Sequence, residues 1–233
     1  MEKELKKLLK KLEKNKEYKV YLQITPYTLW YMDKLGMEYN RDAIEEKLSY
    51  FSVSLKALDL EIEKDKVTGK EYLDVLIGKK STKKSLGFYL AKKLRRYVKT
   101  AKSKDLFKKL CKTVLKEKKS KNINELIKNR EKTGDYLAEA TKELIKEDIK
   151  TNNKKFDLFL HESMKMNQLM DSYVDLEEDY EKGELKFKPT IKDRNKLRIK
   201  LLKDTLRNLR KFPLTGAFLI SGIIFLKKMK KKK

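Results

Sequence analysis

The chain has 233 residues, of which 41% are charged and 39% are hydrophobic. A typical globular protein has about 25% charged residues, so much of the surface here must be solvated charge. The chain has only 8 Gly and 3 Pro residues, too few for the many turns of an all-β or α/β protein. The composition therefore predicts an all-α fold.

The net charge is strongly positive, with 60 Lys and Arg residues against 35 Asp and Glu residues, or +25 at pH 7. Such a field attracts anionic partners, including nucleic acid, a ribosome or acidic lipid headgroups. A lysine-rich composition also arises simply because helices tolerate Lys. The single Cys111 excludes an intramolecular disulfide and fits a reducing compartment. The first 12 residues have no apolar run long enough for a secretory signal.

The N-terminal half contains several stretches with helical periodicity. Leucines at 5, 8, 9 and 12 predict a short amphipathic helix. Thr25 followed by Pro26 resembles a helix start, with Tyr27, Trp30 and Tyr31 in the helix that follows. Packing of these aromatic rings in a core is the more common outcome, and a contact surface is the alternative.

The clearest periodicity predicts a helix over residues 40–63, with apolar residues at alternating steps of four and three. Its seam is as narrow as that of a coiled coil, and consists of Ile44, Leu48, Phe51, Leu55, Leu58 and Ile62. Residues 67–78 are compatible with strand or helix. Further helical stripes cover residues 86–98, 106–114, 123–129, 135–149 and 156–173. We interpret residues 1–176 as one helical bundle domain and residues 177–189 as an acidic-to-basic linker.

The C-terminal 51 residues carry a disproportionate share of the charge. Residues 183–233 contain 17 Lys or Arg and three acidic residues, so +14 of the total charge lies there. Thr190 is a plausible N-cap for a basic amphipathic helix over residues 190–211. Its apolar stripe is Ile199, Leu202, Leu206 and Leu209. Its cations, the predicted anionic-surface-binding residues, are Lys196, Lys200, Lys203, Arg207, Arg210 and Lys211.

Two interpretations of this helix are open. In the first, the helix lies on anionic lipid with its cations toward phosphate. In the second, it is a bundle helix with a solvated basic face. The uncharged residues 212–226 favour the membrane. At about 1.5 Å per residue they span about 22 Å, short of a roughly 30 Å hydrocarbon core, but flanking lysines can snorkel. A buried core helix, or a re-entrant or interfacial segment, is the alternative.

The predicted membrane-inserting residues are Phe212, Pro213, Leu214, Gly216, Phe218, Leu219, Ile220, Gly222, Ile223, Ile224, Phe225 and Leu226. A polylysine tail over residues 227–233 follows them.

The entry to this segment resembles the membrane-entry region of the Letm family. The resemblance covers roughly 40 residues and is carried by Thr190, Arg194, Leu197, Leu202, Asp204, Arg207 and the Lys211, Phe212, Pro213 run. It implies a basic helix that leads into a membrane helix opened by proline. The family's apolar segment normally continues through further prolines, whereas lysines stop it here. A ribosome-binding or ion-transport role is implied by kinship alone.

Signals for chemistry are weak. His161 beside Glu162 is more typical of a partly exposed bundle histidine than of a general base, and Cys111 is more typical of packing than of a nucleophile. The acidic run at 177–179 lacks the EF-hand pattern, so a solvated acidic face is favoured over a metal site. No nucleotide-binding or metalloprotease string occurs. We therefore expect no enzyme activity, no small-molecule substrate, no cofactor and no metal.

A basic run at residues 92–99, with Tyr97 available for stacking, is the best nucleic-acid candidate, although solvated charge is favoured. The leading hypothesis is a non-enzymatic protein anchored in a membrane by its C-terminal region, with its bulk in the cytoplasm or an equivalent reducing compartment. The alternative is a soluble nucleic-acid-binding or ribosome-associated protein that buries residues 212–226 as core.

Overall fold

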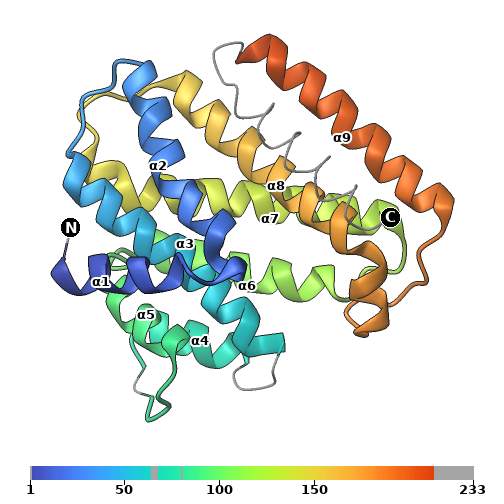
Figure 1. Cartoon of the computed structure of the whole chain (residues 1–233), viewed down its shortest axis with the longest axis horizontal. Helices are drawn as coiled ribbons and strands as arrows, with labels where there is room; N and C mark the ends of the chain where they lie inside the picture. Colours follow the sequence, from blue (N-terminus) through green and yellow to red (C-terminus); the bar gives the residue numbers. More distant parts are fainter. Residues whose placement is uncertain (1, 64–67, 80, 213–233) are drawn as a thin grey trace. The chain divides into compact units, whose positions relative to one another are not determined.

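The computed structural model describes residues 2–63, 68–79 and 81–212. Its regular elements in this range are all helices, which confirms the all-α prediction, and an isolated bridge pairs Tyr39 with Ile149. The helices are α1 (Lys3–Leu12), η1 (Lys16–Tyr18), α2 (Lys19–Lys34), α3 (Arg41–Glu63), α4 (Gly69–Leu76), α5 (Leu86–Leu94), α6 (Ala101–Glu117), α7 (Ile123–Ile145), η2 (Lys146–Asp148), α8 (Lys154–Glu181) and α9 (Ile191–Lys211) (Figure 1).

None of the helices in these described ranges is long and apolar enough to cross a membrane. Of the predicted membrane-inserting residues, those from Pro213 to Leu226 lie outside the described residues.

The chain divides into two compact units. Unit 1 comprises Met1–Cys111 and Ala140–Phe156, and unit 2 comprises Lys112–Glu139 and Asp157–Lys233. The division falls inside α6 and α7 and near the start of α8. The domain boundaries expected at 176 and 189 stay predictions.

Helix α3 is the central element of unit 1, where it packs against α2, α4 and α5 (Figure 1). The predicted seam residues Ile44, Leu48 and Phe51 are buried, as are Tyr50 and Val53 on other faces of the helix. The buried surface of α3 is therefore wider than the seam in the sequence, because neighbours cover the helix on more than one side.

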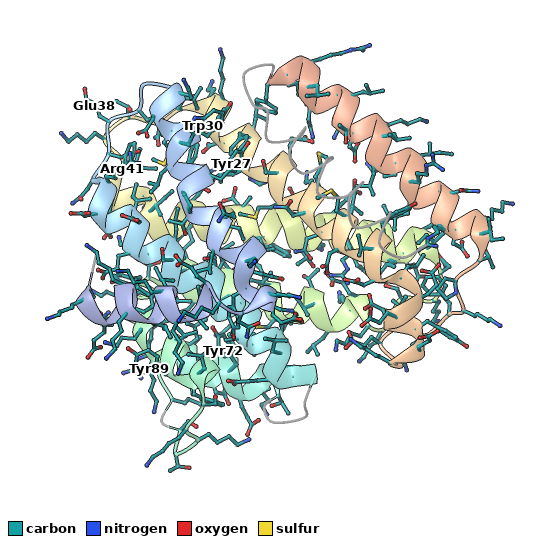
Figure 2. All side chains as sticks on the ribbon, viewed as in Figure 1. Tyr27, Trp30, Glu38, Arg41, Tyr72 and Tyr89 are labelled. Atoms are coloured by element: carbon teal, nitrogen blue, oxygen red, sulfur yellow. The ribbon has the colours of Figure 1, made fainter. Side chains whose placement is uncertain are left out.

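The predicted start of a helix at Pro26 is wrong. Helix α2 begins at Lys19 and contains Pro26 in its interior, although proline lacks the N–H that would bond to the carbonyl of Leu22. A proline in the first turn and a proline in mid-helix leave the same local signal. The aromatic residues after it divide: Tyr31 is buried, whereas Tyr27 and Trp30 are half-buried and stack with their ring centroids 5.7 Å apart (Figure 2).

Two further segments can be compared with the predicted helices. The ambiguous segment after residue 67 is helix α4, whose start is fixed by a capping box between Thr68 and Glu71. The two helices predicted at 123–129 and 135–149 are the single helix α7, which continues through Gly134. A Cβ at Gly134 would lie 2.6 Å from the backbone N and Cα of Lys165 in α8. Gly134 therefore permits a close helix contact and does not mark a helix end.

Unit 2 is built around α7, α8 and α9, with α9 lying beside α8 (Figure 1). Its core cluster comprises Ile123, Leu126, Leu169, Tyr173, Leu176, Leu185, Leu197 and Leu201. Helix α8 continues to Glu181, so the acidic run at 177–179 is helical. Gly183 follows with a φ of 74°, the left-handed conformation that favours glycine after a helix C-terminus.

Candidate membrane-binding surface

Side-chain contacts fix both ends of α9. At the N-terminus, the Asp193 amide donates to Thr190 Oγ1 at 3.2 Å and the Thr190 amide donates to the Asp193 carboxylate at 3.0 Å. This reciprocal pair is a capping box, which satisfies two of the free amides at a helix start. After the last turn, the buried Phe212 ring packs edge-on against Phe159, with centroids 6.1 Å apart. The capping box confirms the expected N-cap at Thr190.

The face of α9 that packs against the rest of unit 2 is apolar at one end and polar at the other. Its buried residues are Leu197, Leu201, Asp204 and Asn208, which share one helix face because they are spaced by four, three and four. Asp204 is 5% exposed and Asn208 is 0% exposed. Asn208 Nδ2 lies 3.1 Å from the Met166 sulfur, but its Oδ1 has no hydrogen-bond partner among the described residues.

Ion pairs hold the polar end of this face. Lys200 Nζ lies 2.7 Å from Glu131 and 3.0 Å from Asp204. Arg207 Nη2 lies 2.7 Å from Glu162 and 3.2 Å from Asp204. Burial alone would lower the pKa values of Lys200 and Arg207, but hydrogen bonds to the carboxylates outweigh it and raise both. These two cations are therefore committed to contacts within unit 2.

The six predicted surface-binding cations thus fall into two groups. Lys200 and Arg207 are paired as described, and Lys211 lies 3.9 Å from Glu162. By contrast, Lys196, Lys203 and Arg210 are exposed and have no acidic partner within the part of the chain that the structure describes. These three side chains, which we call the free cations, are available to an external anion.

Large apolar side chains on the outer face of α9 are exposed. Ile191 is 82% exposed, Ile199 is 52%, Leu202 is 54% and Leu206 is 61%. At about 100° per residue these four lie within an arc of about 80°, and we call them the outer stripe. Leu209, which the sequence placed in the same stripe, is half-buried.

The free cations follow directly beside the outer stripe on the helical wheel, at about 20° to 60° from its edge. An apolar strip and a cationic strip therefore run side by side along the exposed half of α9. This arrangement is typical of helices that lie at a membrane interface, and exposed apolar side chains that adjoin one another commonly mark interaction sites.

His161 and Glu162, considered above for general-base chemistry, contact other side chains of unit 2. His161 Nδ1 lies 2.7 Å from Asp135 and His161 Nε2 lies 2.9 Å from Glu139, while Glu162 pairs with Arg207. Cys111 is half-buried, and burial raises the pKa of its thiol to about 11. The thiol is therefore protonated at neutral pH, the less nucleophilic form.

The acidic run at the end of α8 is occupied by cations of the chain. Glu177 lies 2.9 Å from Arg194, and Glu178 lies 2.9 Å from Lys182. In the described ranges no group of three or more potential ligands is arranged to hold a metal ion.

The basic run at residues 92–99 is also partly neutralised within unit 1. Lys93 lies 3.0 Å from Glu4 and Arg96 lies 2.8 Å from Glu2, and the Tyr97 hydroxyl donates to Glu46. These contacts reduce the charge and the stacking surface that the run offers to nucleic acid.

Sequence reasoning missed a partly buried charge cluster in unit 2. Arg130 lies 3.3 Å from Glu117, 3.6 Å from Asp171 and 3.8 Å from Asp179. Burial raises the pKa of Glu117, and burial also raises the pKa of Asp179 to about 7. No sequence signal identifies the cluster, because its members come from three helices.

The chain was compared with protein-family models, with curated proteins and with solved structures, and none of the three comparisons found a match.

Proposed function

We propose that this protein binds anionic membrane surfaces through the exposed half of α9, and that the uncharged residues after α9 enter the bilayer. The observation that carries the proposal is the outer stripe beside the free cations. No acidic side chain described in the structure neutralises these cations, and the aliphatic side chains next to them remain in water.

The energetics of the outer stripe favour a lipid interface. Full burial of a Leu or Ile side chain is worth roughly 1.5 to 3 kcal/mol. Ile199, Leu202 and Leu206 are each a little over half exposed, so about half of that free energy is available from each. Each cation near an anionic surface adds about 1 kcal/mol. Together these contributions are large enough to hold a folded protein on lipid.

The geometry lets α9 remain docked while it binds. Its other face is held by Leu197, Leu201 and the ion pairs to Glu131 and Glu162, so the outer stripe reaches lipid without unfolding unit 2. Phe212 is buried against Phe159, and we therefore place the start of the inserted stretch after Phe212. The Letm resemblance of this region supports the same role and stays a prediction.

Vesicle flotation tests the proposal with pairs of matched variants. Leu202→Gln and Leu158→Gln each remove one exposed leucine from unit 2, with 54% and 51% exposure. We expect only Leu202→Gln to weaken binding to vesicles of phosphatidylglycerol and phosphatidylcholine.

A second pair of variants, which have the same net charge as each other, tests the cations. The double variant Lys203→Ala, Arg210→Ala removes two free cations, and the double variant Lys108→Ala, Lys112→Ala removes two exposed lysines from α6. Because each cation contributes about 1 kcal/mol, the first should weaken binding by well over tenfold. The second should have a much smaller effect.

Three results would contradict the proposal. Equal losses in the two leucine variants would show that the outer stripe has no special part in binding, and equal losses in the two double variants would show that only the overall charge matters. RNA binding with a steep dependence on salt, without binding to vesicles, would favour the nucleic-acid alternative.

A further inference from the structure

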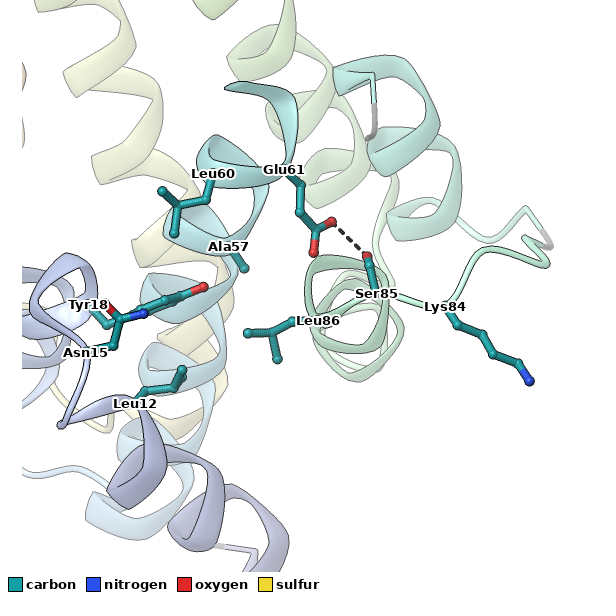
Figure 3. Close-up of a pocket in the computed structure, with 9 residues that line it drawn as sticks. All are labelled: Leu12, Asn15, Tyr18, Ala57, Leu60, Glu61, Lys84, Ser85 and Leu86. Atoms are coloured by element: carbon teal, nitrogen blue, oxygen red, sulfur yellow. Dashed lines mark hydrogen bonds between the residues drawn. The ribbon is translucent and has the colours of Figure 1, made fainter. Parts of the chain in front are cut away.

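Unit 1 contains a pocket that is separate from α9. Its volume is about 470 Å³, within the range of small-molecule sites. The end of α1, the η1 segment, helix α3 and the start of α5 form it (Figure 3). The residues that line it are Leu12, Asn15, Tyr18, Ala57, Leu60, Glu61, Lys84, Ser85 and Leu86.

The walls of this pocket are mainly aliphatic. Leu12, Ala57, Leu60 and Leu86 come from three helices, and Figure 3 shows the Leu86 side chain directed toward the space between Ala57 and Tyr18. Such walls favour a ligand with an apolar body.

The Glu61 carboxylate is held in a fixed position at one side. Its Oε1 accepts from the Gly87 amide at 2.7 Å and its Oε2 accepts from Ser85 Oγ at 2.7 Å. A Cβ at Gly87 would lie only 2.5 Å from Glu61 Oε2, so glycine at this position permits the approach of the carboxylate.

Both of these donors are neutral. Within the described ranges, no Lys or Arg lies within ion-pair distance of Glu61, although Lys84 also lines the pocket. A carboxylate has about four acceptor positions, so Glu61 can accept further hydrogen bonds. Among the residues that the structure describes, the carboxylate therefore has no cation as partner, although the chain has a net charge of +25.

Tyr18 supplies a second polar group. Burial, followed by the nearby Glu61 carboxylate, raises the pKa of Tyr18, so its hydroxyl is neutral at neutral pH. In Figure 3 the hydroxyl points into the space beside Ala57. The hydroxyl can both donate and accept a hydrogen bond.

We propose that this pocket binds a primary amine on a compact aliphatic body, with its ammonium group against Glu61 and its body against the leucines. An ammonium group has three N–H donors, which suit the acceptor positions that Ser85 and Gly87 leave open on the Glu61 carboxylate. An anionic headgroup would be repelled by Glu61. A neutral alcohol would form hydrogen bonds without the charge.

Three probes with the same six-carbon chain test the proposal on the full chain. Hexylamine, hexanol and hexanoate are titrated into the ¹⁵N-labelled protein, and amide shifts are followed at Tyr18, Ala57, Ser85 and Gly87. We expect saturable shifts with hexylamine and at least tenfold weaker binding of the other two. Glu61→Gln should abolish this preference for the amine, whereas Asp59→Asn, which removes an exposed carboxylate two residues away in α3, should preserve it.

The comparison of the three probes uses the natural chain, so it does not depend on a variant that folds. Equal affinity for the three probes would overturn the proposal, as would an absence of saturable shifts at these four amides with tens of millimolar hexylamine. Retention of the amine preference in a folded Glu61→Gln variant would also overturn it. The pocket and α9 belong to different units, so neither result depends on membrane binding.

Discussion

Asp179 is expected to make the stability of unit 2 fall as the pH rises. Burial raises the pKa of its carboxyl from 3.8 to about 7; Arg130 opposes this shift, and the nearby Asp171, Glu184 and Asp175 add to it. The folded state therefore favours the protonated carboxyl. We predict that Asp179→Asn, which keeps the shape and removes the ionisation, stabilises unit 2 at alkaline pH.

The sign and the magnitude follow from linkage. Because the folded pKa lies above the unfolded value, the contribution to stability is fully present below about pH 4 and is lost as the pH rises through about 7. A difference of about three units corresponds to about 4 kcal/mol at most. The side chain is 19% exposed, and solvent screening should reduce the effect to about 2 kcal/mol.

Urea unfolding at pH 4.5 and pH 8 checks this prediction. Hydrogen exchange of α7 and α8 provides the local measurement. Asp179→Asn should exceed the natural chain by about 2 kcal/mol at pH 8 and by only about 0.5 kcal/mol at pH 4.5, where most of the contribution is still present. Glu181→Gln removes an exposed acidic group from the same helix and should show no such difference. A lower stability of Asp179→Asn at pH 8 would refute the reasoning, because it would mean that the ionised carboxylate stabilises the cluster.

Three further substitutions test the packing of unit 2 and the position of α9. Gly134→Ala should lower the free energy of unfolding by about 1 to 3 kcal/mol in urea titrations, because a Cβ there meets the backbone of Lys165. The control Gly69→Ala, where the nearest atom is 3.8 Å away, should cause no loss. An equal loss in both variants would argue against the close helix contact. Asn208→Leu should slow hydrogen exchange in α9, since it removes a buried carbonyl without a hydrogen bond, worth about 1 kcal/mol, and faster exchange would count against this. Thr190→Ala should cost about 1 kcal/mol and speed exchange in the first turn of α9, and unchanged rates would show that the capping box is dispensable.

The fold class and several helices could be predicted from the sequence because they depend on local information. The periodicity of α3 and the Thr190 cap of α9 are set by neighbours within one or two turns. Pro26 and Gly134 were misinterpreted for the opposite reason. Whether a proline or glycine ends a helix or lies within it depends on what packs against it, and for Gly134 that is the Lys165 backbone, 31 positions later in the chain.

The same limitation applies to the candidate site, because the sequence of α9 contains two possible buried faces. By apolar content, the face of Ile199, Leu202 and Leu206 is the better candidate for burial, yet unit 2 buries the face that contains Asp204 and Asn208. Asp204 tolerates burial because Lys200 and Arg207 neutralise it, and these cations also pair with Glu131 and Glu162, distant in sequence. A buried charge is acceptable only with such partners. Because the partners select the polar face, the more apolar face of α9 remains exposed, and that exposed face is the one we propose to contact lipid.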